Sequence, residues 1–381
     1  MSIGHRRAGL ALLAAATSLA LITGCSGGGI LNKGAESSGA SGETKTRIAS
    51  LLQPADNPWV QNNIKFQKQV ADALGIDLTI TSDQGTDDSN VASMRALIAS
   101  KPNGILFDPI SEAAGKQDAQ LLEDNKTVGV TEDRLVVPDF KDYKGTYLKA
   151  QVTQSNETWG YNTATSLIKG GSTKIVSILP PHGILTVETF WKGVKKALAE
   201  HPEVTLVQEN WGPQSRENAI QVMQQYLTKF GQGQIDGVIA IGSTMGLGAQ
   251  YAVKQAGLAD RIKVATADDD PDVVKAILDG DLAITYGTHW TNGGWGLIAL
   301  YDQLHGFAPK DPQPQFNLFA ITKDNAKQYS DRFLSGQVLT ADQIRSLSQV
   351  YNKNADLPGF IANFYKTWAD PNSGLPSPST K

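Results

Sequence analysis

The sequence predicts an α/β fold of two similar lobes, each built on a parallel β-sheet. Short runs rich in β-branched residues alternate with segments whose apolar residues recur at helical spacing, which is the pattern of successive βαβ units. The series begins near residue 46 and starts again after residue 150 with the same plan. The chain has 381 residues, of which 40% are hydrophobic, so it is long enough to bury the cores of two domains.

In the first half, an expected helix follows each expected strand. Val60, Ile64, Ala71 and Leu74 fall on one face of the first helix, and Gly75 ends it. Further segments with helical spacing follow the second and third strands. The expected strands are residues 47–52, 76–81, 104–107 and 128–131.

The second half repeats this plan. Val187, Trp191 and Val194 share a helical face, and Asp270 followed by Pro271 marks the start of a later helix. The expected strands here are residues 174–179, 204–208, 237–241, 262–267 and 282–286.

The C-terminal part of the chain has a different pattern. Residues 316–322 are expected to form one more strand, and residues 325–368 are expected to be mostly helical. The polar, proline-rich end is typical of a frayed tail. The sequence assigns no function to this extension.

Composition and motifs argue against two classes of function. The formal net charge is −4 and the basic residues are scattered, so no nucleic-acid partner is expected. The histidines lack metal-binding spacing, the serine of IGSTMG stands one place early for a hydrolase elbow, and GQGQIDG precedes a strand, whereas a dinucleotide loop follows one. We therefore expect no enzyme activity, no metal and no cofactor.

The start of the chain carries a targeting signal. Basic residues precede an apolar run, so residues 1–24 are expected to be a signal peptide and residues 25–45 a flexible linker. The segment ITGC, which ends at the single cysteine Cys25, resembles the bacterial lipobox, although Ile22 stands where leucine is commoner. A lone cysteine beside a polar linker has no disulfide partner in the chain. It also has no neighbouring base that could activate it as a nucleophile. The resemblance implies lipid attachment at Cys25 and an extracytoplasmic protein anchored to the cell membrane; an uncleaved anchor or an incidental cysteine are the alternatives.

Several short motifs lie near the ends of expected strands. They are Asn57-Pro58-Trp59, FDPIS at 107–111, Asp133-Arg134, Ser155-Asn156, MGLGAQYAVKQAG at 245–257, ADDDPD at 267–272 and ITKDN at 321–325. Through these motifs the sequence resembles the sugar-binding solute receptors of bacterial ABC importers, the ribose-binding-protein-like group of type I periplasmic binding proteins. The likeness covers residues 46–325 in order.

The resemblance implies two doubly wound lobes joined by three hinge crossings, with a ligand bound in the cleft between them. The first lobe would comprise residues 46–152 and 289–315, the second residues 153–288 and 316–325, and residues 326–381 would form the extension. It also implies a monomer that delivers its ligand to an ABC permease. ATP would be hydrolysed by a separate subunit, because the chain has no GxxxxGK[ST] loop.

The resemblance places several ligand contacts in the first lobe. Trp59 can stack on a sugar ring or anchor its helix in the core, and Asn57 can bond sugar hydroxyls or cap that helix. Asp108 and Asp133 follow strands, and an ionised carboxylate accepts strong hydrogen bonds from hydroxyl groups. Arg134 is expected either to bind the ligand or to pair with a neighbouring acid.

The resemblance also places ligand contacts at Asp268 and Trp211 in the second lobe and at His289, just after the crossing strand that leaves it. His289 stands where the family often has an amide side chain, and a neutral imidazole can form the same hydrogen bonds; a structural contact in the hinge is the alternative. Glu188 stands where many relatives have arginine, so the pocket is expected to be more acidic unless Glu188 faces solvent. The neighbouring acids interpreted as charges at a helix start are Asp269, Asp270 and Asp272.

The sequence therefore predicts an extracytoplasmic binding protein of an ABC importer, with a sugar or polyol as its ligand. An acidic pocket would favour an amino sugar or another cationic ligand. The alternative function is a receptor of the same fold that presents a signalling furanone, nucleoside or amine to a membrane sensor.

Overall fold

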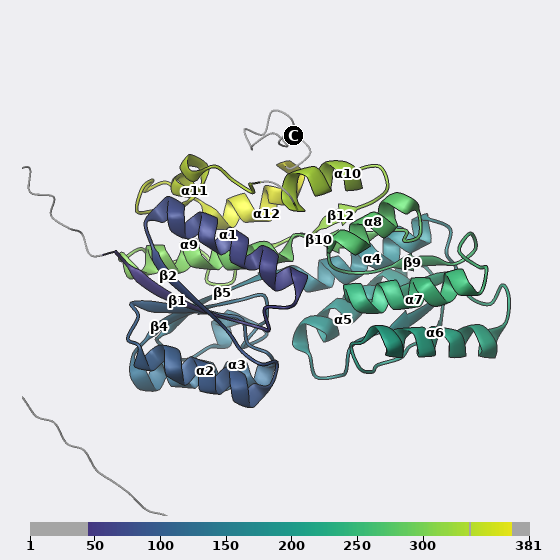
Figure 1. Ribbon diagram of the computed structural model, residues 1–381, viewed down its shortest axis with the longest axis horizontal. Coiled ribbons are helices and arrows are strands. Elements are labelled where there is room, and N and C mark those ends of the chain that lie inside the picture. The colour runs from purple at the N-terminus through teal and green to yellow at the C-terminus, as the bar shows by residue number, and fades with distance from the viewer. Residues whose placement is uncertain (1–44, 335–336, 368–381) are drawn as a thin grey trace, which may run out of the picture. The chain divides into compact units, whose positions relative to one another are not determined.

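Two parallel β-sheets, each covered by helices on both faces, form the framework of the protein (Figure 1). The computed structural model describes residues 45–334 and 337–367, which fall in one unit of contacting residues. Cys25, the expected signal peptide and nearly all of the expected linker lie outside the described residues. The predicted α/β fold with two parallel sheets is confirmed.

The first sheet has six parallel strands in the order β11-β5-β4-β3-β1-β2. Strands β1 to β4 match the predicted strands to within one residue at each end. The sequence pattern does not predict β5, because its run LKAQVTQ is half polar, yet nearly every residue of it is buried in the sheet. The strands are β1 (Arg47–Leu52), β2 (Asp77–Ser82), β3 (Gly104–Phe107), β4 (Val128–Glu132), β5 (Leu148–Gln154) and β11 (Gln315–Phe316).

Helices α1 and α9 cover one face of this sheet, and α2 and α3 cover the other (Figure 1). α1 (Pro58–Leu74) begins where the Asn57 side chain accepts a hydrogen bond from the Trp59 amide at 2.9 Å, and it ends at Gly75, whose φ is 71°. The short loop between β1 and α1 therefore places Trp59 near the carboxyl end of β1. The other helices of this sheet are α2 (Asp87–Ala99), α3 (Glu112–Asn125) and α9 (Asn292–Leu304).

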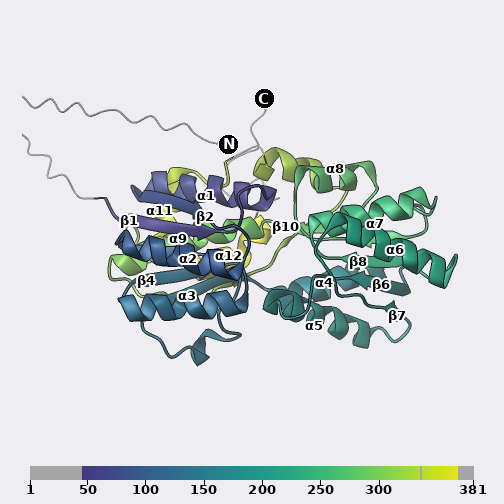
Figure 2. The same ribbon diagram turned by 60° about the horizontal axis from the view of Figure 1, so that its bottom comes forward.

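The second sheet has four parallel strands in the order β7-β6-β8-β9, with α4 and α5 on one face and α6 and α7 on the other (Figure 2). α4 and α5 pack backbone to backbone. A Cβ on Gly160 would lie 1.8 Å from the Phe190 carbonyl oxygen, and one on Gly193 would lie 1.9 Å from that of Glu157, so only glycine fits at these two positions. The elements are β6 (Lys174–Ile178), β7 (Thr205–Gln208), β8 (Gly237–Ala240), β9 (Lys263–Ala265), α4 (Asn156–Lys169), α5 (Leu185–Glu200), α6 (Arg216–Phe230), α7 (Ser243–Gln255) and α8 (Pro271–Asp279).

The chain crosses between the two sheets three times, as predicted. β5 leads into α4, β10 (Thr285–Gly287) leads through the short helix η2 (His289–Thr291) into α9, and β11 leads into β12 (Phe319–Ile321), which pairs antiparallel with β10. The prediction of one strand over residues 316–322 is wrong. The chain leaves the first sheet after Phe316, so two short strands in different sheets replace it.

The C-terminal extension is helical, as predicted, and packs against α1 and α9 (Figure 1). Arg345 Nε donates to the Ala73 carbonyl oxygen of α1 at 3.0 Å, and the Phe364 ring meets Trp295 of α9 edge-on, with 5.4 Å between ring centroids. Its elements are α10 (Ala326–Tyr329), η3 (Ser330–Leu334), α11 (Ala341–Leu347) and α12 (Leu357–Thr367).

Asp118 on α3 is a fully buried carboxyl group, and neither of its oxygens has a hydrogen-bond partner in the described part of the chain. Burial, with a smaller contribution from the charge of Asp83, raises the pKa of Asp118 to about 7. Between about pH 4 and pH 7 the folded state therefore holds a proton that the unfolded state has released. Stability contributed by this group falls as the pH rises through that range.

Asp118→Asn is expected to raise the free energy of unfolding at pH 8 by about 2 kcal/mol, because the neutral isostere removes the ionisation of a buried carboxyl group. Urea unfolding at pH 5 and pH 8 measures the change, which should be smaller at pH 5. Asp124→Asn, at an exposed position on the same helix, is the control. Equal gains for the two variants, or a gain independent of pH, would contradict the prediction.

Candidate ligand-binding site

A cavity of about 800 Å³ lies at the carboxyl ends of strands from both sheets. Its walls come from segments that follow β1 and β4 in the first sheet and β7, β8 and β9 in the second, and from η2 at the second crossing. Parallel α/β sheets bind their ligands at this edge, so the cavity is the candidate site. Of the residues predicted from the sequence, those that line it are Asn57, Trp59, Asp133, Arg134, Asp268 and His289.

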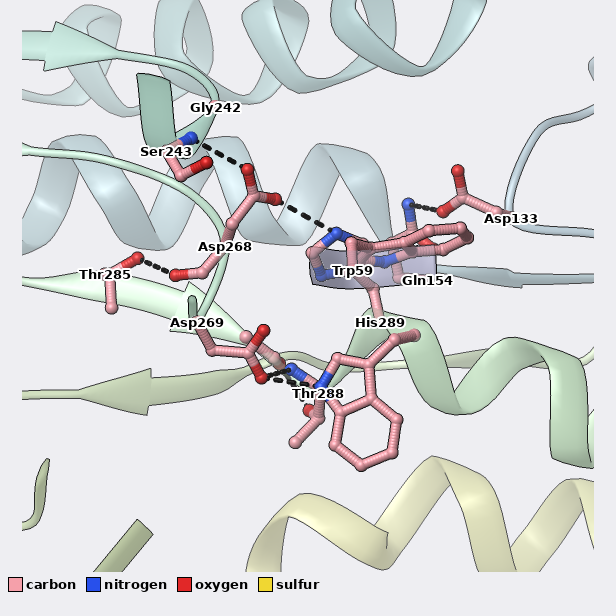
Figure 3. Close-up of polar contacts among 12 residues, drawn as sticks. Trp59, Asp133, Gln154, Gly242, Ser243, Asp268, Asp269, Thr285, Thr288 and His289 are labelled. Atoms are coloured by element: carbon pink, nitrogen blue, oxygen red, sulfur yellow. Dashed lines mark hydrogen bonds and ion pairs between the residues drawn. The ribbon is translucent and has the colours of Figure 1, made fainter. Parts of the chain in front are cut away.

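Trp59 forms part of the cavity wall, although only 6% of the residue is exposed. Its ring lies against that of His289, with 5.7 Å between centroids and 33° between planes (Figure 3). Trp59 packs against its neighbours, as one of its two expectations predicts, and it also lines the cavity; stacking on a sugar stays a prediction. Asn57 caps α1 with its side-chain oxygen, as one of the two interpretations predicts, and it also borders the cavity.

Asp268 and His289 form an ion pair in the cavity wall. His289 Nε2 lies 3.1 Å from Asp268 Oδ1, and the Ser243 amide donates to Asp268 Oδ2 at 2.8 Å (Figure 3). Burial alone would lower the pKa of His289, but the hydrogen bond and charge of Asp268, helped by Asp133 and Asp269, raise that pKa to about 9. Burial would likewise raise the pKa of Asp268, but His289 and the Ser243 amide lower it. This pKa favours a protonated imidazole at neutral pH over the neutral imidazole that the sequence interpretation considers.

Asp133 connects the cavity to two of the crossings. It follows β4 with a left-handed φ of 57°, and its Oδ1 accepts from Gln154 Nε2 at 3.1 Å (Figure 3). Gln154 Oε1 in turn accepts from Asn292 Nδ2 at 2.8 Å, so the first and second crossings are bonded to each other. The sequence analysis misses Gln154 and Asn292; their one signal is that each lies beside a predicted crossing.

Arg134 donates its hydrogen bonds to backbone carbonyl oxygens and to an amide side chain. Among the described residues it does not pair with a neighbouring acid, which was one of its two expected roles. Its guanidinium donates to the carbonyl oxygens of Pro109, at 3.3 Å, and Ile110, and to Gln53 Oε1 at 3.3 Å. Gln53 Nε2 donates to Asp108 Oδ2 at 2.6 Å. These bonds hold the planar guanidinium in a fixed orientation at the cavity wall.

Asp108 lies behind Gln53 and does not line the cavity. Its side chain is fully buried, and burial together with the charge of Asp133 raises the pKa of Asp108 well above its usual range. Asp108 therefore reaches the cavity through Gln53 and not directly.

Asp269 is a buried acceptor, so its interpretation as a charge at a helix start is wrong. The residue is fully buried, and its Oδ2 accepts from Trp290 Nε1 at 2.7 Å, from the Thr288 amide at 3.1 Å and from the Tyr329 hydroxyl. Asp269 thereby joins the second crossing to the C-terminal extension. The first residue before α8 is Asp270, whose side chain forms no capping bond.

Trp211 and Glu188 form a separate cluster that does not line the cavity. The His182 ring stacks on Trp211 with 3.8 Å between centroids and 20° between planes, and His182 Nδ1 lies 2.9 Å from Glu188 Oε1. The bond from His182 lowers the pKa of Glu188. Glu188 is partly exposed and carries its own basic partner, so it adds no charge to the cavity wall.

The arrangement suits the binding of a hydroxyl-rich molecule. An indole, several carboxyl groups and the fixed guanidinium of Arg134 surround one space, and such groups bind the apolar and polar faces of a hydroxyl-rich ligand. Among the described residues, no three His, Cys, Asp or Glu side chains are placed to hold a metal ion. In residues 45–334 and 337–367, no helix has the length and apolar character needed to cross a membrane.

Comparisons with known proteins give the family. Residues 48–306 match the family model of the periplasmic binding protein domain. A xylitol-binding protein of Mycolicibacterium smegmatis is 29% identical over 191 residues, an alignment that spans 49% of this chain and only 53% of that protein. A fructose import binding protein of Bifidobacterium longum is 24% identical over 305 residues, which cover 78% of this chain and 89% of that protein.

A solved structure of a periplasmic sugar-binding protein from Pseudomonas fluorescens has the same fold. Its TM-score is 0.71 at 22% identity, over 81% of this chain and 95% of that one. The family match covers more than half of the chain and includes every segment that builds the cavity. The chain therefore belongs to the type I periplasmic binding proteins, a family of binding proteins and not of enzymes.

Proposed function

We propose that the protein is the solute-binding component of an ABC importer, which binds a sugar or polyol in the cavity and delivers it to a permease. One observation carries the proposal: the indole of Trp59 and the carboxylate of Asp133 line the same cavity, between sheets that are joined by three crossings. An aromatic face packs on the apolar face of a sugar, and a carboxylate accepts bonds from its hydroxyls. The relatives named for xylitol and fructose support this class of ligand.

Thermal unfolding of the purified protein tests the proposal. The panel contains xylitol, D-fructose, other pentoses, hexoses and polyols, together with amino sugars, nucleosides and amines. A ligand that binds only the folded state raises the melting temperature. At a ligand concentration of a hundred times the Kd, it adds about 2.7 kcal/mol to the free energy of unfolding. A shift with a neutral sugar or polyol supports the proposal; shifts confined to nucleosides or amines would replace it with the signalling receptor.

We further propose that the protein is held at the cell membrane by lipid on Cys25. The proposal rests on the apolar segment that ends in ITGC. Labelling of cells with a fatty-acid analogue should mark the native protein and leave Cys25→Ser unmarked. A marked Cys25→Ser protein would refute this attachment site.

A further inference from the structure

The C-terminal extension contacts both lobes. Its first part, α10 and η3, packs on α8 of the second lobe (Figure 1). Its later helices belong to the first lobe, since α11 packs on α1, and α12 packs on α9 and β11. The chain therefore passes between the lobes once more after the third crossing. The family match ends at residue 306, before this additional passage.

The first part of the extension is fixed at the second crossing. The Tyr329 hydroxyl donates to Asp269 Oδ2, and the Thr288 amide donates to the same oxygen at 3.1 Å. Thr288 has a left-handed φ of 78°, a strained conformation for a β-branched residue. Hinges consist of a few such residues at the ends of elements, whose φ and ψ change when domains move. Tyr329 thus attaches the extension beside a residue that is a candidate hinge.

The later part of the extension is fixed to α1 by three polar bonds from separate points. The bond from Arg345 to the end of α1 is one of them. The Val338 amide donates to Gln69 Oε1 at 3.3 Å, and the Tyr351 hydroxyl donates to the Leu74 carbonyl oxygen at 3.3 Å. Because these bonds reach different turns of one helix, this part of the extension must move with the first lobe.

Phe364 on α12 joins the two parts through a buried aromatic cluster. Its ring lies 5.4 Å from that of Trp295 on α9 and 5.3 Å from that of Phe319 on β12, beyond the third crossing. Phe319 in turn lies 5.3 Å from Phe333 of η3. Phe364 is fully buried. Moving the lobes apart would separate these rings and expose apolar surface to water, so the cluster opposes that movement.

We propose that the extension, residues 326–367, is a strap that limits how far the two lobes can separate, and that it thereby sets the affinity of a cavity that its described residues do not line. The effect on affinity rests on the proposed function, whereas the restraint on the lobes does not. If the strap were loosened, ligand-free molecules would spend more time opened too far to bind. The apparent Kd rises as the fraction of binding-competent molecules falls.

Distances between two spin labels in the ligand-free protein test the restraint. The labels are attached at Gln117→Cys on α3 and Gln225→Cys on α6, two exposed positions on helices that lie on the side opposite the extension (Figure 1). Cys25 is the single cysteine of the chain, so Cys25→Ser leaves only the two introduced thiols. Phe364→Leu keeps an apolar side chain but removes the ring that joins the lobes. The measured distances should lengthen, and their distribution should broaden.

Phe360→Leu is the matched control. Phe360 lies on the same helix, and its ring contacts those of Trp295 and Phe364, so the variant should keep the wild-type distances. Wild-type distances in a Phe364→Leu protein that still melts cooperatively, or equal lengthening in the control, would overturn the proposal. If Phe364→Leu does not fold, Tyr329→Phe decides, because it keeps the ring and removes only the bond to Asp269. It should lengthen the distances, and wild-type distances would then overturn the proposal.

Calorimetry with xylitol and D-fructose measures the effect on affinity. Phe364→Leu should raise the Kd of whichever ligand binds by at least about threefold, whereas Phe360→Leu should leave it unchanged. Saturating ligand should bring the labels to the same distance in the wild type and in both variants, because the closed state is selected in each. An unchanged Kd in a Phe364→Leu protein with lengthened distances would refute the link to affinity. If no sugar or polyol binds, the proposed function fails, while the ligand-free distances still decide whether the extension restrains the lobes.

Discussion

Asp269→Ala is expected to lower the free energy of unfolding by at least about 3 kcal/mol, because it leaves three buried donors without an acceptor. These donors are the Trp290 indole, the Thr288 amide and the Tyr329 hydroxyl, and all of them point to Asp269 Oδ2. An unsatisfied buried donor costs about 1–3 kcal/mol. Urea unfolding followed by tryptophan fluorescence measures the loss.

Further variants separate three contributions of Asp269 to stability: its role as a hydrogen-bond acceptor, its charge and the volume of its side chain. Asp269→Asn keeps an oxygen that can accept, so it should lose less stability than the alanine variant. Tyr329→Phe removes one of the three donors and should cost about 1 kcal/mol. Asp272→Asn, at an exposed position on α8, is the control for changing an acid in the same segment. An alanine variant as stable as this control would show that the hydrogen bonds to Asp269 do not contribute to the free energy of unfolding.

The position of Asp269 gives this result a meaning beyond stability. The residue bonds to Thr288, which immediately precedes His289 in the cavity wall, and to Tyr329 in the extension. The extension is therefore tied to the crossing that carries His289, a residue of the cavity wall. This is the clearest physical role that the structure gives to a segment outside the family match.

Local sequence patterns predicted much of the fold. Strands β1 to β4 are short apolar runs, and the first helix is marked by its cap, by proline and by the glycine at its end. Strand β5 and the split of residues 316–322 could not be predicted in this way. Their pairing is decided by neighbours far along the chain, as when β11 pairs with β5.

The candidate site was predictable in place but not in detail. The resemblance to a two-lobed receptor placed Asp133 and Asp268 at one cleft although they follow strands of different sheets, and both line the cavity. Three consecutive aspartates look alike in the sequence, yet Asp269 alone is fixed by Tyr329, sixty residues away. The raised pKa of His289 likewise depends on partners that the sequence cannot place beside it.

Trp59→Ala is expected to weaken the binding of xylitol or D-fructose, whichever binds the wild type, by at least about 30-fold. A buried tryptophan at the centre of a binding site commonly contributes 2 kcal/mol or more, and every 1.4 kcal/mol is tenfold in affinity. Trp59 is buried, lines the cavity and packs against His289, so its removal would take away the stacking surface and let water reach the His289 ring. Calorimetry at pH 7 measures the change.

Trp59→Phe distinguishes the aromatic face from the rest of the side chain. Phenylalanine keeps a ring against His289 but is smaller and has no indole N–H, whose nitrogen is buried without a hydrogen-bond partner among the described residues. If stacking on the ligand dominates, the phenylalanine variant should retain affinity to within about tenfold while the alanine variant does not. If both variants lose affinity equally and both still melt cooperatively near the wild-type temperature, the indole N–H contributes the essential contact. Wild-type affinity in the alanine variant would mean that the ligand does not lie against Trp59, and the cavity would then have to be rejected as the binding site.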